Sequence, residues 1–238
     1  MTEPKNILDL FLEYTEEVKE NFAAYALAGA GIGMVMIPSS IILVFVVYGA
    51  AALGALPGLA AEDELMLVVG ALTSTIMAVF VCSMLLNLLV VPMHASMLRA
   101  IDEHQSGESE GSLSFDATWA SFTENMRGPL IYIALQLVIY LFLLFFCLFP
   151  GLIFILIIDF AWPLVVLEQK GPLAAMRISA VHFRDHIAWH LGYLLILVSV
   201  AFVLAYVPLV GAFISPGLVG GWRVFVYRQI RQDLLSIA

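Results

Sequence analysis

The basic residues of this chain are confined to short segments, and long stretches without any Lys or Arg separate them. The three longest of these stretches are 21–98, 128–169 and 185–222. Each is long enough to cross a lipid bilayer and return, since one helical crossing needs ~20 apolar residues. Loops on the cytoplasmic side of a membrane are enriched in Lys and Arg. Placing all ten basic residues on that side predicts a multi-pass membrane protein whose N- and C-termini are both cytoplasmic.

The composition supports a membrane protein over a soluble one. Hydrophobic residues make up 62% of the chain and charged residues only 12%, whereas about a quarter of the residues of a soluble domain are charged. The net charge of −9 disfavours nucleic acid as a partner. Cys82 and Cys147 lie in apolar runs, where we interpret them as small hydrophobic residues rather than a disulfide. The acidic N-terminal segment lacks the basic opening of a signal peptide, so the first span is expected to act as an uncleaved insertion signal.

Pro and Gly residues divide the apolar sequence into six predicted spans. The predicted turns are Ala55–Gly58 with the acids that follow it, Phe149–Gly151, and Val207–Pro208, because Pro removes a backbone donor and disfavours helix in the preceding residue. The spans cover about 22–50, 65–93, 129–149, 152–167, 187–206 and 209–227. The fold class is therefore an all-α integral membrane protein with six transmembrane helices in three hairpins. The prolines could instead be kinks, and the short fourth span leaves a kinked unit of spans 3 and 4 as an alternative.

An amphipathic helix is predicted on the cytoplasmic side before each hairpin. Apolar residues recur at helical spacing in segments that begin near Ile7, Phe115 and Leu173, and Gly171–Pro172 is a suitable start for the third. The pattern predicts one membrane domain, 1–238, with repeats 4–98, 113–168 and 171–231 in a pseudo-threefold arrangement. The alternative is that any protein built of hairpins alternates in this way.

The first amphipathic helix differs from helices that bind anionic lipid, which are usually basic. It carries six acids against Lys5 and Lys19. We expect it to pack on the cytoplasmic ends of the spans, with a role as a lipid-surface anchor as the alternative.

Two stretches carry a resemblance to known families. One is an apolar span ending in Glu, followed by a Gly, an Ala-rich helix, a Ser and the next span; its residues are Glu168, Gly171, Ala174, Ala175 and Ser179. The other runs from Val91–Pro92 through Arg99 towards Phe115. The chain resembles bacterial inner-membrane proteins of the YciC type and the membrane domain attached to some glycerophosphodiester phosphodiesterases. The resemblance implies a six-span protein of the bacterial inner (cytoplasmic) membrane, and it implies no activity.

Asp159 is an acid within the predicted fourth span, in an otherwise apolar context. An ionisable group inside a membrane is costly and is a candidate functional site by default. As a substrate or ion site, Asp159 would act with Asn87 in a central polar site of a transporter. Alternatively, it would form a hydrogen bond that pins span 4 to span 2 through Asn87, Ser83 or Thr75.

Three histidines, His182, His186 and His190, recur at i, i+4 and i+8. On one continuous helix they would align as candidate metal ligands. The third amphipathic helix is expected to end near Asp185, which would break the alignment, and His residues at the headgroup boundary explain the cluster without a metal. No metal and no cofactor is therefore expected.

Small residues predict close helix packing at two places. Gly29 and Gly33 form one GxxxG motif and Gly217 and Gly221 form another, and this spacing lets helix backbones approach closely. Pro92, Pro163 and Pro216 interrupt the even-numbered spans, either as simple kinks or as breaks that line a cavity.

No catalytic constellation is apparent in the sequence. The preferred hypothesis is a non-enzymatic membrane component that binds lipid or a partner protein, with membrane lipids, further copies of the chain or a partner membrane protein as its partners. The alternative is a small transporter or channel that uses Asp159.

Overall fold

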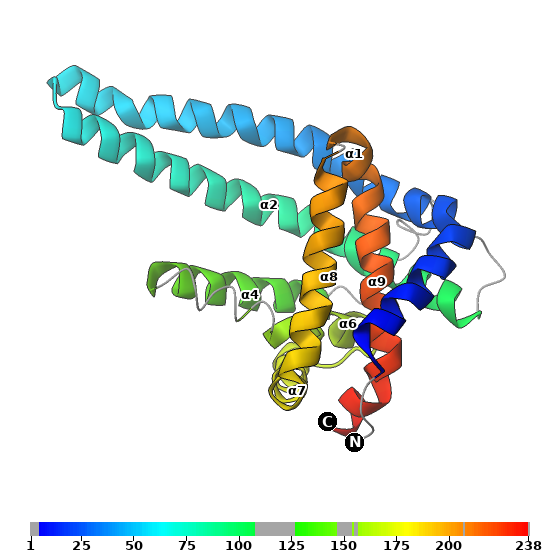
Figure 1. The fold of residues 1–238 in the computed structure, drawn as a ribbon. Coiled ribbons are helices and arrows are strands. Elements are labelled where there is room, and N and C mark those ends of the chain that lie inside the picture. The colour runs from blue at the N-terminus through cyan, green and yellow to red at the C-terminus, as the bar shows by residue number, and fades with distance from the viewer. Residues whose placement is uncertain (1–4, 108–126, 147–153, 155–156, 207, 238) are drawn as a thin grey trace. The chain divides into compact units, whose positions relative to one another are not determined.

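The computed structural model describes residues 5–107, 127–146, 154, 157–206 and 208–237, and the regular secondary structure of these residues is helical (Figure 1). The predicted all-α class is confirmed, while the six-span arrangement stays a prediction. The helices are α1 (Ile7–Ala61), α2 (Glu64–Ser106), α4 (Arg127–Phe146), α6 (Ala161–Val166), α7 (Pro172–Asp185), α8 (Ile187–Ala205) and α9 (Pro208–Ser236).

The chain forms two compact units. One is the helical hairpin Met34–Val90, and the other joins Met1–Gly33 to Val91–Ala238. The first unit contains the far end of α1 and the beginning of α2. The second contains the remaining parts of these two helices together with the helices from α4 to α9, and it holds the candidate site.

The turn of the hairpin lies at the acidic end of the predicted segment. We expected Ala55–Gly58 and the acids Glu62, Asp63 and Glu64 to separate the first two spans, and α1 continues through Pro57 to Ala61, so that only the acids lie outside the helix or at its end. The chain turns at Glu62, whose φ is 53°, and the Asp63 carboxylate then accepts a hydrogen bond from the Met66 amide at 3.0 Å. This side-chain bond satisfies a free amide at the start of α2. Within the predicted segment the acids therefore form the turn, whereas Pro57 stays inside the helix, where it costs one backbone hydrogen bond.

Small residues bring the two helices of the hairpin into backbone contact. A Cβ atom at Gly54 would overlap Ser74 Oγ, and one at Gly70 would overlap the Gly54 carbonyl oxygen. Ser74 Oγ donates a hydrogen bond across the pair to the Ala50 carbonyl at 2.7 Å. Close approach of this kind stabilises helix pairs in membranes, where lipid removes the hydrophobic drive for association.

The structure describes the first and the third of the predicted amphipathic helices. The first is the opening part of α1, and a kink at Asn21 (φ −116°, ψ 18°) separates it from the apolar remainder. The third is α7, which begins at Pro172 directly after Gly171, as predicted. The second, predicted from Phe115 to Met126, lies outside the described residues.

The remaining predicted spans match helices to different degrees. α4 and α8 follow the third and fifth spans closely, and the sixth lies within the longer α9. α2 extends past Pro92 to Ser106, and α9 runs through Pro216. The fourth span is interrupted: the chain makes a turn at Asp159–Phe160 before α6 begins.

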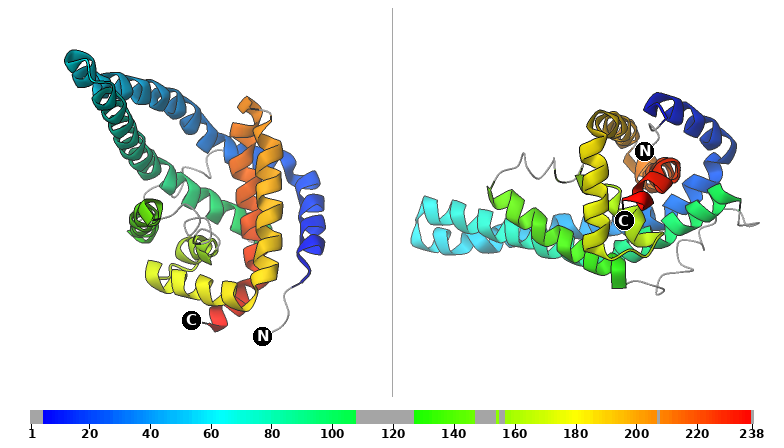
Figure 2. Two further views of the ribbon diagram at one scale, coloured as in Figure 1. Left: turned by 60° about the vertical axis from the view of Figure 1, so that its left-hand side comes forward. Right: turned by 90° about the horizontal axis from the view of Figure 1, so that it is seen from below.

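Aromatic side chains fill the core of the larger unit. Trp222 of α9 contacts Tyr14 and Phe11 of α1 and stacks on Tyr193 of α8, with ring centroids 5.5, 5.7 and 6.0 Å away. α8 and α9 lie side by side and run in opposite directions, and α7 runs across the end of α8 (Figure 2). Tyr14, Tyr193 and Trp222 are each at most 5% exposed.

Among the described residues, two helices are long and apolar enough to cross a membrane. They are α1 and the stretch Ile187–Leu204 of α8.

Candidate functional site

The structure places Asp159 at the turn between residues 157–158 and α6 and gives its carboxylate two partners. Arg223 Nη2 of α9 donates to Oδ1 at 2.9 Å, and Tyr193 Oη of α8 donates to Oδ2 at 2.8 Å. The Asp159 and Arg223 side chains are 14% and 20% exposed. A carboxylate withdrawn from water to this extent needs a charged or hydrogen-bonded partner. Both oxygens of Asp159 have one.

The two partners of Asp159 are residues that the sequence analysis did not single out. Arg223 and Tyr193 supply the two bonds that the structure describes, and the guanidinium neutralises the carboxylate. The contact with span 2 stays a prediction. Asn87 belongs to α2, and its side chain lies outside the described residues. Sequence reasoning missed Arg223 because it was assigned to the cytoplasmic end of the sixth span together with the other basic residues.

The backbone next to Asp159 is also held by side chains. Ser179 Oγ of α7 donates to the Ile157 carbonyl at 2.7 Å, and Tyr132 Oη of α4 donates to the Ile158 carbonyl at 3.2 Å. Hydroxyl groups of neighbouring helices satisfy carbonyl oxygens where a membrane helix is interrupted. Ser179 and Tyr132 are almost fully buried. The turn at Asp159 is thus fixed from three sides, by α4, α7 and the α8–α9 pair.

A second acid of the same segment contacts the next turns of α9. Arg231 Nε lies 2.6 Å from Glu168 Oε1, and Tyr227 Oη donates to the same oxygen at 3.0 Å. The bond to Glu168 raises the pKa of the Arg231 guanidinium above its ordinary value. Arg223, Tyr227 and Arg231 recur at i, i+4 and i+8, so one face of α9 bonds to both acids. This spacing is visible in the sequence and marks a polar face of α9, but it does not say which acids the face will meet.

A third ion pair links α9 to the end of α2. Arg228 Nε lies 3.9 Å from Asp102 Oδ1, and Arg228 Nη1 donates to the Asp102 carbonyl at 3.3 Å. Nearby, Gln105 donates to Tyr25 Oη at 3.0 Å, and Tyr25 Oη donates to Glu17. These polar contacts connect α9, α2 and α1 within the larger unit, so α9 is its central element.

The three histidines meet at the junction of α7 and α8 without forming a continuous helix. α7 ends at Asp185, and His186 separates it from α8. His182 Nδ1 and His190 Nε2 are 2.9 Å apart, and the rings of His182 and His186 are 4.8 Å apart. Burial, and then the neighbouring His186, lowers the pKa of His182 to about 4. Over the described part of the chain, no group of three or more His, Cys, Asp or Glu side chains is arranged to hold a metal ion.

The two GxxxG motifs bring α1 and α9 together. A Cβ atom at Gly29 would lie 2.6 Å from the Gly217 nitrogen, and one at Gly217 would overlap the Tyr25 carbonyl oxygen. A Cβ atom at Gly221 would lie 2.6 Å from Tyr14 Oη, and Gly33 is buried. The structure therefore places Gly29, Gly217 and Gly221 at a contact between helices of the same chain.

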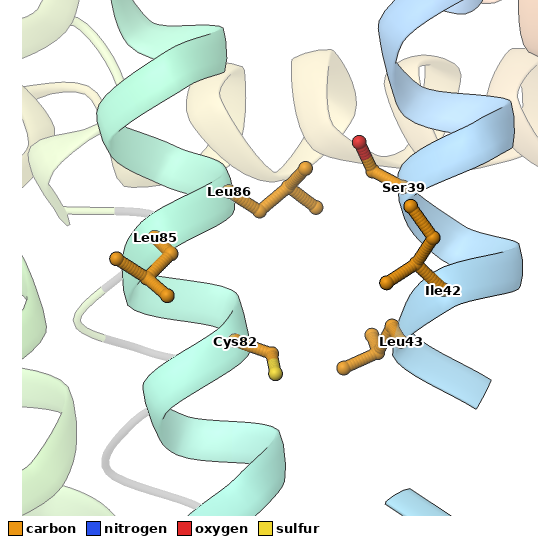
Figure 3. Close-up of a pocket in the computed structure, with 6 residues that line it drawn as sticks. All are labelled: Ser39, Ile42, Leu43, Cys82, Leu85 and Leu86. Atoms are coloured by element: carbon orange, nitrogen blue, oxygen red, sulfur yellow. The ribbon is translucent and has the colours of Figure 1, made fainter. Parts of the chain in front are cut away.

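The hairpin unit contains an apolar hollow of about 230 Å³ between its two helices (Figure 3). Its lining residues are Ser39, Ile42 and Leu43 of α1 and Cys82, Leu85 and Leu86 of α2. The Cys82 thiol is free. Cys147 lies outside the described residues. None of these described lining residues is charged, so the hollow suits an apolar occupant.

Comparison with known proteins identifies no relative: no family model, curated protein or solved structure matches the chain significantly.

Proposed function

We propose that the chain is a six-span protein of the bacterial inner membrane with both termini in the cytoplasm. In this proposal it is a non-enzymatic component that binds membrane lipid or a partner membrane protein. The six spans combine the apolar lengths of α1 and α8 with the apolar sequence of the other predicted spans. The absence of Lys and Arg from the three long stretches supports the orientation.

The exposed apolar surface of the hairpin supports immersion in lipid. Phe45, Tyr48 and Leu65 are 73%, 74% and 73% exposed. An apolar surface of this kind on a soluble monomer would promote aggregation. A bilayer covers it without any further protein.

The two bonded oxygens of Asp159 support a role of this protein other than transport. A carboxylate that binds a proton or cation during transport has to exchange its partners. Asp159 is bonded on one oxygen to Arg223 and on the other to Tyr193. In this arrangement it joins the turn before α6 to α8 and α9, which is a stabilising role.

The alternative, a small transporter or channel, is supported by one specific observation. The chain is interrupted at Asp159–Phe160, and discontinuous helices with an acid at the interruption form the ion sites of many transporters. The Ile157 and Ile158 carbonyls at this position already accept hydrogen bonds from Ser179 and Tyr132. These two hydrogen bonds stabilise the turn at the position where the ion site of a transporter would form.

Proton flux distinguishes the two functions. The purified protein is reconstituted in liposomes that contain a pH-sensitive dye, and a K⁺ gradient with valinomycin drives H⁺ entry. We expect the parent and Asp159→Asn to show the leak rate of protein-free liposomes. A flux in the parent that Asp159→Asn abolishes would support the transporter instead. Lipid that stays bound during purification, detected by native mass spectrometry, tests the binding role directly.

Membrane placement is tested separately. Single cysteines at Glu13 and Asp233, introduced after Cys82 and Cys147 are replaced by Ala, should react with a membrane-impermeant maleimide only after the inner membrane is opened. Labelling of either cysteine from the periplasm of intact spheroplasts would contradict cytoplasmic termini.

A further inference from the structure

We propose that the outer face of α7, formed by Leu173, Arg177, Ala180 and Arg184, binds the headgroups of anionic phospholipids. This inference rests on the proposed membrane placement and names the lipid class and the surface that recognises it.

α7 has two faces of different character. Ala175, Met176 and Ser179 on its inner face are buried against the larger unit. On the outer face Leu173 is 73% exposed, and the side chain of Arg184 is also 73% exposed. Arg177 between them is exposed as well. The residues at i, i+4, i+7 and i+11 share one side of a helix, so the two guanidinium groups lie on the same surface as Leu173.

The position of α7 next to α8 places the helix at the membrane surface. Only His186 separates α7 from α8, whose stretch Ile187–Leu204 is long enough to cross a bilayer. α7 runs across the end of α8 in both views of Figure 2. When α8 crosses the membrane, α7 therefore lies along the surface, at the level of the phosphate groups.

The chemistry of the outer face matches an anionic headgroup and the acyl chains beneath it. Arg forms paired hydrogen bonds with phosphate oxygens, and its long stem lets the charge reach the headgroups while apolar neighbours enter the lipid. Leu173 provides such a neighbour, and Ile187 at the start of α8 is 48% exposed. Basic helices that also carry apolar residues bind anionic membrane surfaces.

The basic outer face of α7 contrasts with the net negative charge of the chain. The protein has 19 acidic and 10 basic residues, and the amphipathic part of α1 is acidic. On α7 the one nearby acid is Asp185, whose carboxylate lies 2.8 Å from Arg184 Nε. Arg177 lies two turns before this pair. A phosphate group that bridges the two arginines is thus expected to depend most on Arg177.

Native mass spectrometry of the full-length protein in detergent tests the proposal. Phosphatidylglycerol and phosphatidylcholine are added in parallel, and the bound lipid is counted. We expect the parent to prefer phosphatidylglycerol and Arg177→Gln to lower its affinity about fivefold, since one basic side chain at an anionic surface contributes ~1 kcal/mol. Arg184→Gln should lower the affinity less, because Arg184 is already paired with Asp185. Lys19→Gln, at an exposed lysine on the acidic segment, is the matched control and should bind like the parent.

Two outcomes would overturn the inference. One is an unchanged lipid preference in the double variant Arg177→Gln/Arg184→Gln that elutes as a folded monodisperse protein. The other is displacement of phosphatidylglycerol by millimolar glycerol phosphate, which would indicate a soluble phosphate ligand. Alkaline carbonate extraction of membranes that contain the parent protein distinguishes failure of this inference from failure of the proposed function. Release of the parent protein by carbonate would contradict its placement in the membrane.

Discussion

The Arg223 guanidinium and the Asp159 carboxylate form an ion pair that joins α9 to the turn before α6, with 2.9 Å between Nη2 and Oδ1. Tyr193 of α8 completes the contact from the other side of the carboxylate. Three segments distant in the sequence thereby converge on one acid. This convergence stabilises the larger unit and accounts for an acid in an apolar part of the chain.

Breaking this ion pair from one side should destabilise the protein strongly. Arg223→Leu leaves the Asp159 carboxylate without its cation, and removal of one partner of a buried pair typically costs about 3–5 kcal/mol. Because both side chains are slightly exposed, we expect a loss at the lower end of this range, measured as a lower thermal midpoint in detergent.

The double variant Asp159→Leu/Arg223→Leu is the control for this effect. Replacing both partners leaves no unpaired charge, so much of the lost stability should return. A double variant no more stable than Arg223→Leu would mean that the pair does not account for the loss.

A methyl group at Gly217 should separate α1 from α9. Its Cβ would overlap the Tyr25 carbonyl oxygen, which belongs to a helix backbone and cannot move alone. We expect Gly217→Ala to cost about 1–3 kcal/mol, in the range of overpacked cores. Fluorescence-detected size-exclusion chromatography after heating provides the measurement. Gly49→Ala is the matched control, because nothing lies within 4 Å of a Cβ at that position, and it should retain the parent midpoint.

The hairpin should respond to substitution at Gly54 independently of the larger unit. Gly54→Val would place its side chain against Ser74 and the Gly70 carbonyl, and the two helices would have to move apart. Hydrogen exchange should accelerate in residues 50–74 and stay unchanged in α7 and α9. Uniformly faster exchange throughout the protein would show that the hairpin is not a separate packing unit.

Acidification should loosen the junction of α7 and α8. The pKa of His182 is lowered to about 4 by burial and by His186, whereas an unfolded histidine titrates near 6.5. The unfolded state therefore binds the proton first, so the stability from neutral His182 is complete above pH ~6.5 and is lost as the pH falls towards ~4. His190 of α8 lies against the His182 ring, and the carboxylates of Asp185 and Asp233 act in the opposite direction by raising the pKa of His182.

The thermal midpoint of the parent should accordingly fall between pH 6.5 and 4.5. His182→Phe keeps a ring of similar shape and cannot be protonated, so its midpoint should fall less over the same interval. Equal pH dependence in the two proteins would assign the effect to other groups.

Local features of the sequence were sufficient for the helical class and for several boundaries. Apolar runs of the length of a bilayer identified α8, because a continuous apolar helix has no other stable surroundings than lipid or a protein core. Gly171–Pro172 identified the start of α7, because Pro at the first turn loses no helical bond. These properties depend on neighbours in the sequence, which is why they could be predicted.

Tertiary structure decided the turn of the hairpin and the environment of Asp159. α1 continues through Pro57 to the acids that cap α2, and beside it Gly54, Gly70 and Ser74 bring the two helices into contact. Asp159 pairs with Arg223 because the fold brings α9 beside the turn before α6, and a charge near the end of one span reveals nothing by itself about which acid it will neutralise. The partner of a buried charge depends on packing between segments distant in the sequence, and such packing cannot be inferred from one sequence alone.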